Sequence, residues 1–223
     1  MRLDAPVVCL VTDRRRLVAN NSDGERGARR RFAEVAREAV EAGVDLIQIR
    51  ERDLEAADLV ELVEAIVRIA RGSSTRVVVN DRLDVALACG ASGVHLRADS
   101  IAPARARSIA PPGFLIGRSV HRLDEAVEHA SEVDYLIAGT VFPTSSKPSA
   151  AWLLGVSGLM EMVRAVSVPV LAIGGMTIER VPQIAATGAA GIAGIGLFMA
   201  GTRSMAEVIE AVRARFDSVK AAS

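Results

Sequence analysis

Short apolar segments alternate with longer segments of helical periodicity along the chain. The apolar segments, rich in Val, Ile and Leu, lie at 7–12, 45–50, 76–80, 93–96, 115–120, 135–141, 169–174 and 191–198. Amphipathic stretches follow them at 31–42, 56–70, 83–89, 102–109, 123–130, 156–165, 177–186 and 205–216. Eight strand–helix units in strict alternation predict a parallel sheet, because parallel strands are joined by crossover helices.

The same alternation predicts a single (β/α)8 TIM barrel with eight parallel strands. An open doubly wound sheet that binds a nucleotide usually carries GxGxxG after its first strand, whereas Thr12-Asp13-Arg14 stands here. A length of 223 residues suits one closed barrel. No linker or composition break divides the chain, so we expect one domain over 1–223, with the barrel at about 7–201 and a C-terminal helix at 202–223.

Composition excludes several classes of protein. Lys and Arg together number 27 and so do Asp and Glu, which argues against a general nucleic-acid binder. The two cysteines, Cys9 and Cys89, show no CxxC spacing, so neither a disulfide framework nor a zinc site is expected. No apolar run reaches the length of a membrane span or a signal peptide, so we expect a cytoplasmic protein without a membrane partner. A homo-oligomer stays open.

Candidate chemistry lies where the predicted strands end, because α/β barrels place their reacting groups there. These positions are polar, cationic and glycine-rich: Gln48, Arg50, Arg52, Asn80, Asp81, His95, Arg97, Asp99, Ser119, His121, Thr144, Ser146, Lys147, Gly174, Gly175, Gly194 and Gly196. Arginine and lysine side chains suit phosphate oxygens, and glycine backbones after the last two strands suit a phosphate. We therefore expect one anion site at Arg50, Arg52 and Lys147, and another at the Gly175 and Gly196 backbones.

Simpler structural explanations compete at several of these positions. Gly174-Gly175 could only form a tight turn, and the Arg50-Glu51-Arg52 run could be a surface charge ladder. Asp81 could merely cap the helix that follows it. His95 lies within an apolar segment and could be a buried histidine with its hydrogen bonds satisfied.

Five segments, in order along the chain, carry a family resemblance: QIRER, VNDRLDVALACGASGVHL, IGRSVHRLDEA, VFPTSSK and PVLAIGGMT. They resemble the successive motifs of the thiamine phosphate synthase and TenI superfamily, from about residue 7 to residue 201. The resemblance implies an enzyme of thiamine biosynthesis, a transferase that joins hydroxymethylpyrimidine diphosphate to a thiazole phosphate and releases pyrophosphate. Its partners would be these phosphorylated pyrimidine and thiazole molecules.

The resemblance also implies roles for single residues. Gln48 and Asn80 would contact the pyrimidine. Pyrophosphate would be held by Arg50, Asn80, Ser119 and Lys147. Thr144 and Ser146 would line the thiazole side, with the Gly175 and Gly196 backbones at its phosphate. Mg²⁺ would be ligated by Asp81. Ser100 stands in place of the family's second acid, and the adjacent Asp99 is the candidate to replace it as a ligand, which the sequence leaves open.

Departures from the family pattern leave two other functions open, one enzymatic and one non-catalytic. Arg97-Ala98-Asp99-Ser100 replaces the family's Gly-Gln-acid-Asp, and Arg52 replaces its lysine. A TenI-type thiazole tautomerase would use His121 to move a proton on a thiazole carboxylate phosphate and would need no metal. A protein that kept the barrel and lost the metal site would bind phosphorylated ligands without catalysis.

Overall fold

The computed structural model describes residues 3, 5–18, 24–144, 153–199 and 203–221. Its strands are β1 (Val7–Val11), β2 (Leu46–Ile49), β3 (Arg76–Asn80), β4 (Gly93–Leu96), β5 (Leu115–Val120), β6 (Tyr135–Ala138), β7 (Val170–Ile173) and β8 (Gly191–Gly194). Its helices are α1 (Arg15–Val18), α2 (Gly24–Glu41), α3 (Ala56–Ala70), α4 (Leu83–Ala88), α5 (Pro103–Ile109), α6 (Leu123–His129), α7 (Gly155–Ala165), α8 (Val181–Ala185), α9 (Gly196–Met199) and α10 (Met205–Ala221). Short 3-10 turns at Ala130–Glu132 and Ile178–Arg180 complete the described elements.

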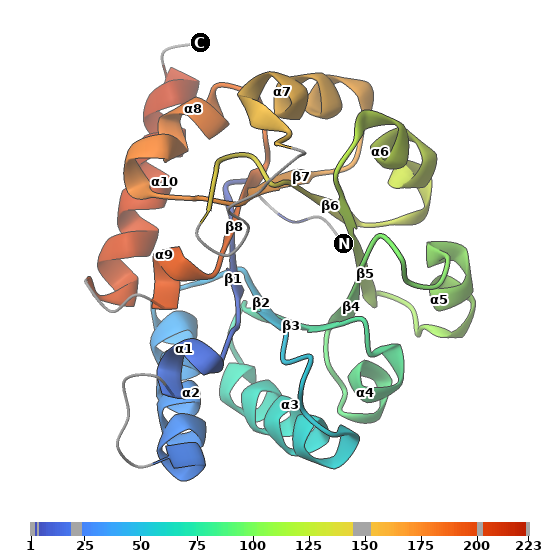
Figure 1. The fold of residues 1–223 in the computed structure, drawn as a ribbon, viewed down its shortest axis with the longest axis vertical. Helices are drawn as coiled ribbons and strands as arrows, with labels where there is room; N and C mark the ends of the chain where they lie inside the picture. Colours follow the sequence, from blue (N-terminus) through green and yellow to red (C-terminus); the bar gives the residue numbers. More distant parts are fainter. Residues whose placement is uncertain (1–2, 4, 19–23, 145–152, 200–202, 222–223) are drawn as a thin grey trace.

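The strands form a closed parallel barrel in the order β1 to β8, which confirms the predicted fold (Figure 1). Every strand pairs with its sequence neighbour, and β8 returns to β1 through the pair Val7 and Gly191. The helices form a ring outside the strands. Because the strands are buried on both faces, they are nearly continuous apolar runs.

Two apolar cores result from this arrangement. The larger core fills the space between strands and helices and includes Val63, Ile66 and Leu159. The smaller core fills the barrel interior and includes Val11, Ile137 and Leu171. Among the described helices, none has both the length and the apolar content that crossing a membrane requires.

The structure corrects some predicted boundaries. Strand β8 ends at Gly194, so Gly196 begins the short helix α9 and is not part of the strand. Helix α2 begins at Gly24, before the predicted start at 31, and includes the basic run at 26–31. Within that run Arg29 pairs with Asp58 and Glu61 of α3, so this run belongs to a helix face.

Gly117 of β5 is required by the packing of the barrel interior. A Cβ atom at this position would lie 2.1 Å from Cζ of the fully buried Tyr135 on β6. We predict that Gly117→Ala lowers the free energy of unfolding by about 1–3 kcal/mol, because extra atoms in a filled core force strain. Urea unfolding followed by circular dichroism measures this change.

A double-mutant cycle separates the steric clash from a general effect of glycine. In a Tyr135→Leu background the penalty of Gly117→Ala should shrink, because the ring that meets the new Cβ is gone. An equal penalty in both backgrounds would show that Tyr135 is not the cause.

Candidate active site

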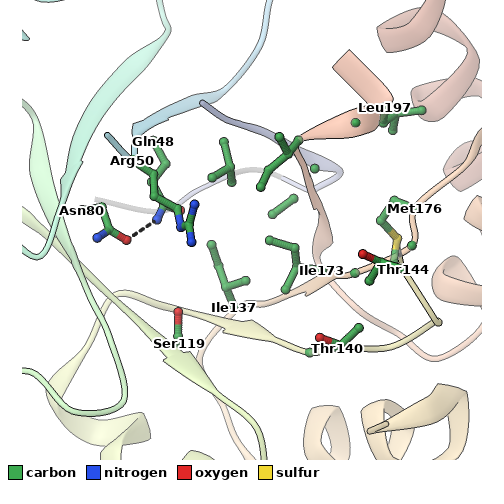
Figure 2. A pocket seen from close by; sticks show the side chains of 18 of the residues that line it. Gln48, Arg50, Asn80, Ser119, Ile137, Thr140, Thr144, Ile173, Met176 and Leu197 are labelled. Carbon is green, nitrogen blue, oxygen red and sulfur yellow. Dashed lines mark hydrogen bonds between the residues drawn. The ribbon is translucent and has the colours of Figure 1, made fainter. Parts of the chain in front are cut away.

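A cavity of about 640 Å³ opens at the C-terminal ends of the strands. Residues from β1 through β8 and the loops that follow them line it, as the barrel rule predicts. Figure 2 shows Gln48, Arg50 and Asn80 on one side, with Thr144, Met176 and Leu197 on the other. The cavity therefore joins a polar, cationic wall to a glycine-rich wall.

A buried carboxylate, that of Glu51, orders the backbone of the cationic wall through hydrogen bonds. Glu51 accepts hydrogen bonds from the Thr12 hydroxyl at 2.6 Å and from the Arg14 backbone N–H at 3.1 Å. The Thr12 hydroxyl oxygen in turn accepts the backbone N–H of Arg50 at 2.9 Å. Burial raises the pKa of Glu51 although these hydrogen bonds oppose the shift. Glu51 thus faces away from the cavity, and its neighbours Arg50 and Arg52 line it.

Three guanidinium groups converge on this wall: Arg50 and Arg52 after β2, and Arg97 after β4. Burial, and then repulsion from Arg50 and Arg97, lower the pKa of Arg52. Asp81 and Asp99 partly compensate this repulsion. Such a group of cations is suited to an anion with several oxygen atoms.

The expected Mg²⁺ ligands take part in other contacts. Asp81 accepts hydrogen bonds from the Ser100 hydroxyl on one oxygen and from Arg97 at 3.3 Å on the other. Asp99 is also paired with Arg97. Among the described residues no group of three or more His, Cys, Asp or Glu side chains is placed to hold a metal ion. This donor set does not fit a Mg²⁺ site with two free carboxylates.

Asp81 is not a helix cap either. The N-cap position of α4 belongs to Arg82, whose side chain makes no capping hydrogen bond. Asp81 itself has a φ of 65°, in the left-handed region that residues other than glycine rarely adopt. Its carboxylate lies beside Arg97 and does not line the cavity.

Gln48 carries a buried hydrogen-bonding atom that has no protein partner. Its Nε2 donates to Oδ1 of Asn80 at 3.0 Å, whereas its Oε1 is buried without a partner (Figure 2). A buried unsatisfied oxygen is costly to a protein unless something else satisfies it. Because Gln48 lines the cavity, a ligand with an N–H or O–H group can supply the missing hydrogen bond.

The floor of the cavity is apolar. Val11, Ile137, Ile173 and Ala193 come from β1, β6, β7 and β8 and line it between the two walls. Figure 2 shows Ile137 and Ile173 near the centre of this floor. A flat, weakly polar ring fits such a surface better than a sugar does, because apolar atoms cannot satisfy hydroxyl groups.

The glycine-rich wall begins directly after β7. Gly175 has a φ of 60°, and a Cβ there would lie 2.6 Å from the Pro143 carbonyl oxygen. Gly196, at the start of α9, also lines the cavity. Gly175 is therefore required by its positive φ and by the packing of the backbone at 142–143, and a phosphate at the Gly175 and Gly196 backbones stays a prediction.

Two arginines on this wall, Arg16 and Arg180, were not among the site residues predicted from the sequence. Arg180 donates to the Gly175 carbonyl at 2.5 Å and stacks on the Phe142 ring, with 4.7 Å between its Cζ and the ring centre. Arg16 of α1 lines the cavity beside Gly196. Neither stands at a strand end, so only the glycines near them gave a signal.

A chain of hydrogen bonds runs from the buried Tyr135 through His95 to Ser119 at the cavity. His95 is 1% exposed, and its ring nitrogens contact the Tyr135 hydroxyl at 3.2 Å and the Ser119 hydroxyl at 2.8 Å. Burial and the nearby Arg118 lower the pKa of His95 to about 3. His95 is therefore a neutral histidine at physiological pH whose ring nitrogens both have partners, although it also borders the cavity.

His121 is the other histidine at the mouth. It lines the cavity, and its Nδ1 hydrogen-bonds to the Gly139 carbonyl oxygen. A carbonyl only accepts, so the proton of this bond lies on Nδ1. Nε2 is then the ring nitrogen with which His121 could take a proton.

The structure brings most of the predicted site residues together. The cavity lining contains Gln48, Arg50, Arg52, Asn80, Asp99, Ser119, His121, Thr144, Gly175 and Gly196. Ser146 and Lys147 lie outside the described residues. The individual roles of all these residues, and the expected Mg²⁺, stay predictions.

Comparison with known proteins shows which family this chain resembles. Residues 16–198 match the family model described as thiamine monophosphate synthase. The thiamine-phosphate synthase of Methanoculleus marisnigri is 42% identical over 195 residues, which cover 84% of this chain and 92% of that protein. That of Methanoregula boonei is 44% identical over 173 residues, covering 77% and 80%.

Solved structures agree with these sequence matches. The thiamine phosphate pyrophosphorylase of Pyrococcus furiosus superposes with a TM-score of 0.80 at 33% identity, covering 96% of each chain. A 3-hexulose-6-phosphate synthase superposes with a TM-score of 0.68 at only 16% identity, which shows a shared fold alone.

The buried His95 predicts a specific dependence of stability on pH. Its folded pKa of about 3 lies below the ordinary histidine pKa of 6.5, so the unfolded chain binds a proton that the folded chain excludes. Stability from neutral His95 is present above pH 6.5 and is lost as the pH falls toward 3. From pH 7 to pH 4 this loss amounts to about 3 kcal/mol.

His95→Gln should remove this loss, because glutamine keeps hydrogen-bonding atoms and does not titrate. Urea unfolding of both proteins is measured at a series of pH values. The difference between their free energies of unfolding at each pH removes the contribution of the carboxylates, which both proteins share. The advantage of the wild type over the variant should fall by about 3 kcal/mol between pH 7 and pH 4. A constant difference would show that His95 is not held neutral by burial.

Proposed function

This chain belongs to the thiamine monophosphate synthase family, and we propose that it is a thiamine-phosphate synthase, a transferase that joins hydroxymethylpyrimidine diphosphate to a thiazole phosphate with release of pyrophosphate. The observation that carries this proposal is one cavity with an anion-binding wall on each side of an apolar floor. One substrate has a ring and a diphosphate and the other has a ring and a single phosphate, so two rings and two anionic groups must fit the same mouth.

The pyrimidine lies against Gln48 and Asn80 in this proposal. The unsatisfied Oε1 of Gln48 accepts a hydrogen bond from an N–H group of the substrate, and the Asn80 amide holds Gln48 in place. Ile137 and Ile173 exclude water from beneath the ring. This desolvation strengthens every hydrogen bond made at the edge of the ring.

The diphosphate of the pyrimidine substrate lies against Arg50 and Arg52. The phosphate of the thiazole lies against the Gly175 and Gly196 backbones, with Arg16 beside them. Ser119, also at the mouth, is hydrogen-bonded to His95, and when His95 carries its proton on Nε2 the Ser119 hydroxyl is free to donate to a diphosphate oxygen. The reacting atoms then meet between the two walls, over the apolar floor.

The reaction follows from this placement. The C–O bond between the pyrimidine methylene and the diphosphate breaks, and its electron pair leaves with the diphosphate oxygen. The positive charge left on the methylene is captured by the thiazole nitrogen, which forms the new C–N bond. Groups that stabilise the departing anion accelerate the first step, because negative charge increases there in the transition state.

The thiazole tautomerase and the non-catalytic binding protein are the alternatives. His121 at the mouth, with its proton held on Nδ1 by Gly139, is compatible with the tautomerase. The named relatives support the synthase over both alternatives. A cytoplasmic location, a homo-oligomeric state and a requirement for Mg²⁺ remain expectations from the sequence.

The direct test supplies both substrates and separates the products by chromatography. We expect thiamine phosphate and pyrophosphate in equal amounts from the wild type, with and without added Mg²⁺ tested side by side. Gln48→Leu should raise KM for the pyrimidine substrate by about tenfold or more, because it removes a buried hydrogen-bonding group. KM for the thiazole phosphate should change little.

His121→Ala separates the two enzymatic readings. A synthase keeps most of its turnover in this variant, whereas a tautomerase loses it, because its proton must move through the histidine. A parallel assay measures conversion of a thiazole carboxylate phosphate. Tautomerisation that His121→Ala abolishes, without any thiamine phosphate formed by the wild type, would contradict the synthase.

A further inference from the structure

Arg97 occupies a bridging position between two carboxylates at the cationic wall. Its Nη1 lies 3.3 Å from Oδ2 of Asp81, and its Nη2 pairs with Oδ2 of Asp99. The second oxygen of Asp81 accepts from the Ser100 hydroxyl, and the Ser100 hydroxyl oxygen accepts the Arg97 backbone N–H at 2.8 Å. These contacts place a fixed positive charge between the two acids that sequence analysis assigned to a metal.

The loop that carries Arg97 is held by a buried arginine on the outer face of the barrel. Arg118 of β5 is 5% exposed and donates to the Ala98 carbonyl at 2.8 Å and to the Ile101 carbonyl at 3.3 Å. The backbone after β4 is thereby fixed on both sides of Asp99. Arg97 is therefore presented to the cavity by a positioned loop.

We propose that Arg97 is the resident cation of this site, and that it neutralises the departing diphosphate together with Arg50 and Arg52 in place of a metal held by two carboxylates. This inference rests on the proposed synthase activity and concerns how the site handles charge. The contacts carry it: Arg97 pairs with both Asp81 and Asp99, and the Ser100 hydroxyl occupies the other oxygen of Asp81, so neither carboxylate is free for a metal ion.

The electrostatic balance of the wall agrees with this role. Arg50, Arg52 and Arg97 carry three positive charges, and the repulsion among them acts on Arg52. Asp81 and Asp99 oppose this effect on Arg52, and both also pair with Arg97. The Arg97 side chain is 36% exposed, and ion pairs that exposed are weak, so a diphosphate can compete with the carboxylates for the guanidinium.

The chemical step needs no further reactant. The C–O bond breaks, the electron pair moves onto the diphosphate oxygen, and the new negative charge is shared with guanidinium N–H groups. An arginine presents N–H groups in a plane that matches two oxygens of one phosphate, which lysine does not. No proton leaves Arg97, because guanidinium stays charged in proteins.

Calorimetric titration with inorganic pyrophosphate in excess EDTA tests the binding part. The wild type should bind pyrophosphate without metal, and Arg97→Gln should weaken binding by about tenfold to a hundredfold. Arg105→Gln is the matched control, because Arg105 is an exposed arginine of α5 outside the cavity. It should bind as the wild type does. Equal binding by Arg97→Gln and Arg105→Gln would overturn the proposal.

Turnover in the same buffers tests the catalytic part. Wild-type kcat should fall less than about threefold in EDTA, while Arg97→Gln should lose far more, and Arg97→Lys should recover only part of the loss. In an Arg97→Gln, Ser100→Asp double variant, which frees Asp81 and adds a second acid, turnover should recover with Mg²⁺ and not in EDTA. Wild-type turnover that EDTA abolishes and Mg²⁺ restores would overturn the proposal.

The two arms distinguish failure of this inference from failure of the proposed function. If no thiamine phosphate forms under any condition, the proposed synthase activity is wrong. The pyrophosphate titration still measures how much Arg97 contributes to pyrophosphate affinity. If thiamine phosphate forms only with Mg²⁺ in the wild type, the synthase stands and Arg97 is not its resident cation.

Discussion

The backbone hydrogen bonds that join β1 to both β2 and β8 close the barrel, and the position of every site residue depends on that closure. In a closed parallel ladder all eight strands point the same way, so their C-terminal ends form one ring. The register places Val11 beside Gln48 and Asn80 beside His95. Residues far apart in the sequence therefore share one cavity without any long insertion.

The arginine side chains of the cationic wall line the cavity, and carboxylates that are buried or lie next to them hold this wall in place. Glu51 is buried and orders the backbone of Arg50 through Thr12, while Asp81 and Asp99 hold Arg97. These contacts hold arginines that repel one another at a common site. The cost of their repulsion is relieved when an anion binds, which favours binding of a diphosphate.

The sequence allowed the fold and most of the mouth to be predicted, because the alternation of strands and helices depends on local residues and a barrel places its reacting groups at the strand ends. It did not reveal Arg16 or Arg180, since both reach the cavity from helical turns and only tertiary packing places them there. It also did not reveal the Arg97–Asp81 pair, because residues 16 positions apart meet only after β3 and β4 have paired. The end of β8 was predicted too late, because Leu197 and Phe198 continue the apolar run inside α9.

The claim that unites these observations is that two anions bind on opposite walls of one cavity. A crystal structure of the protein with inorganic pyrophosphate and a thiazole phosphate tests it directly. The account predicts pyrophosphate against Arg50 and Arg52, and the monophosphate against the Gly175 and Gly196 amides with its ring over Ile173. Both anions on the same wall, or either bound outside the mouth of the barrel, would contradict it.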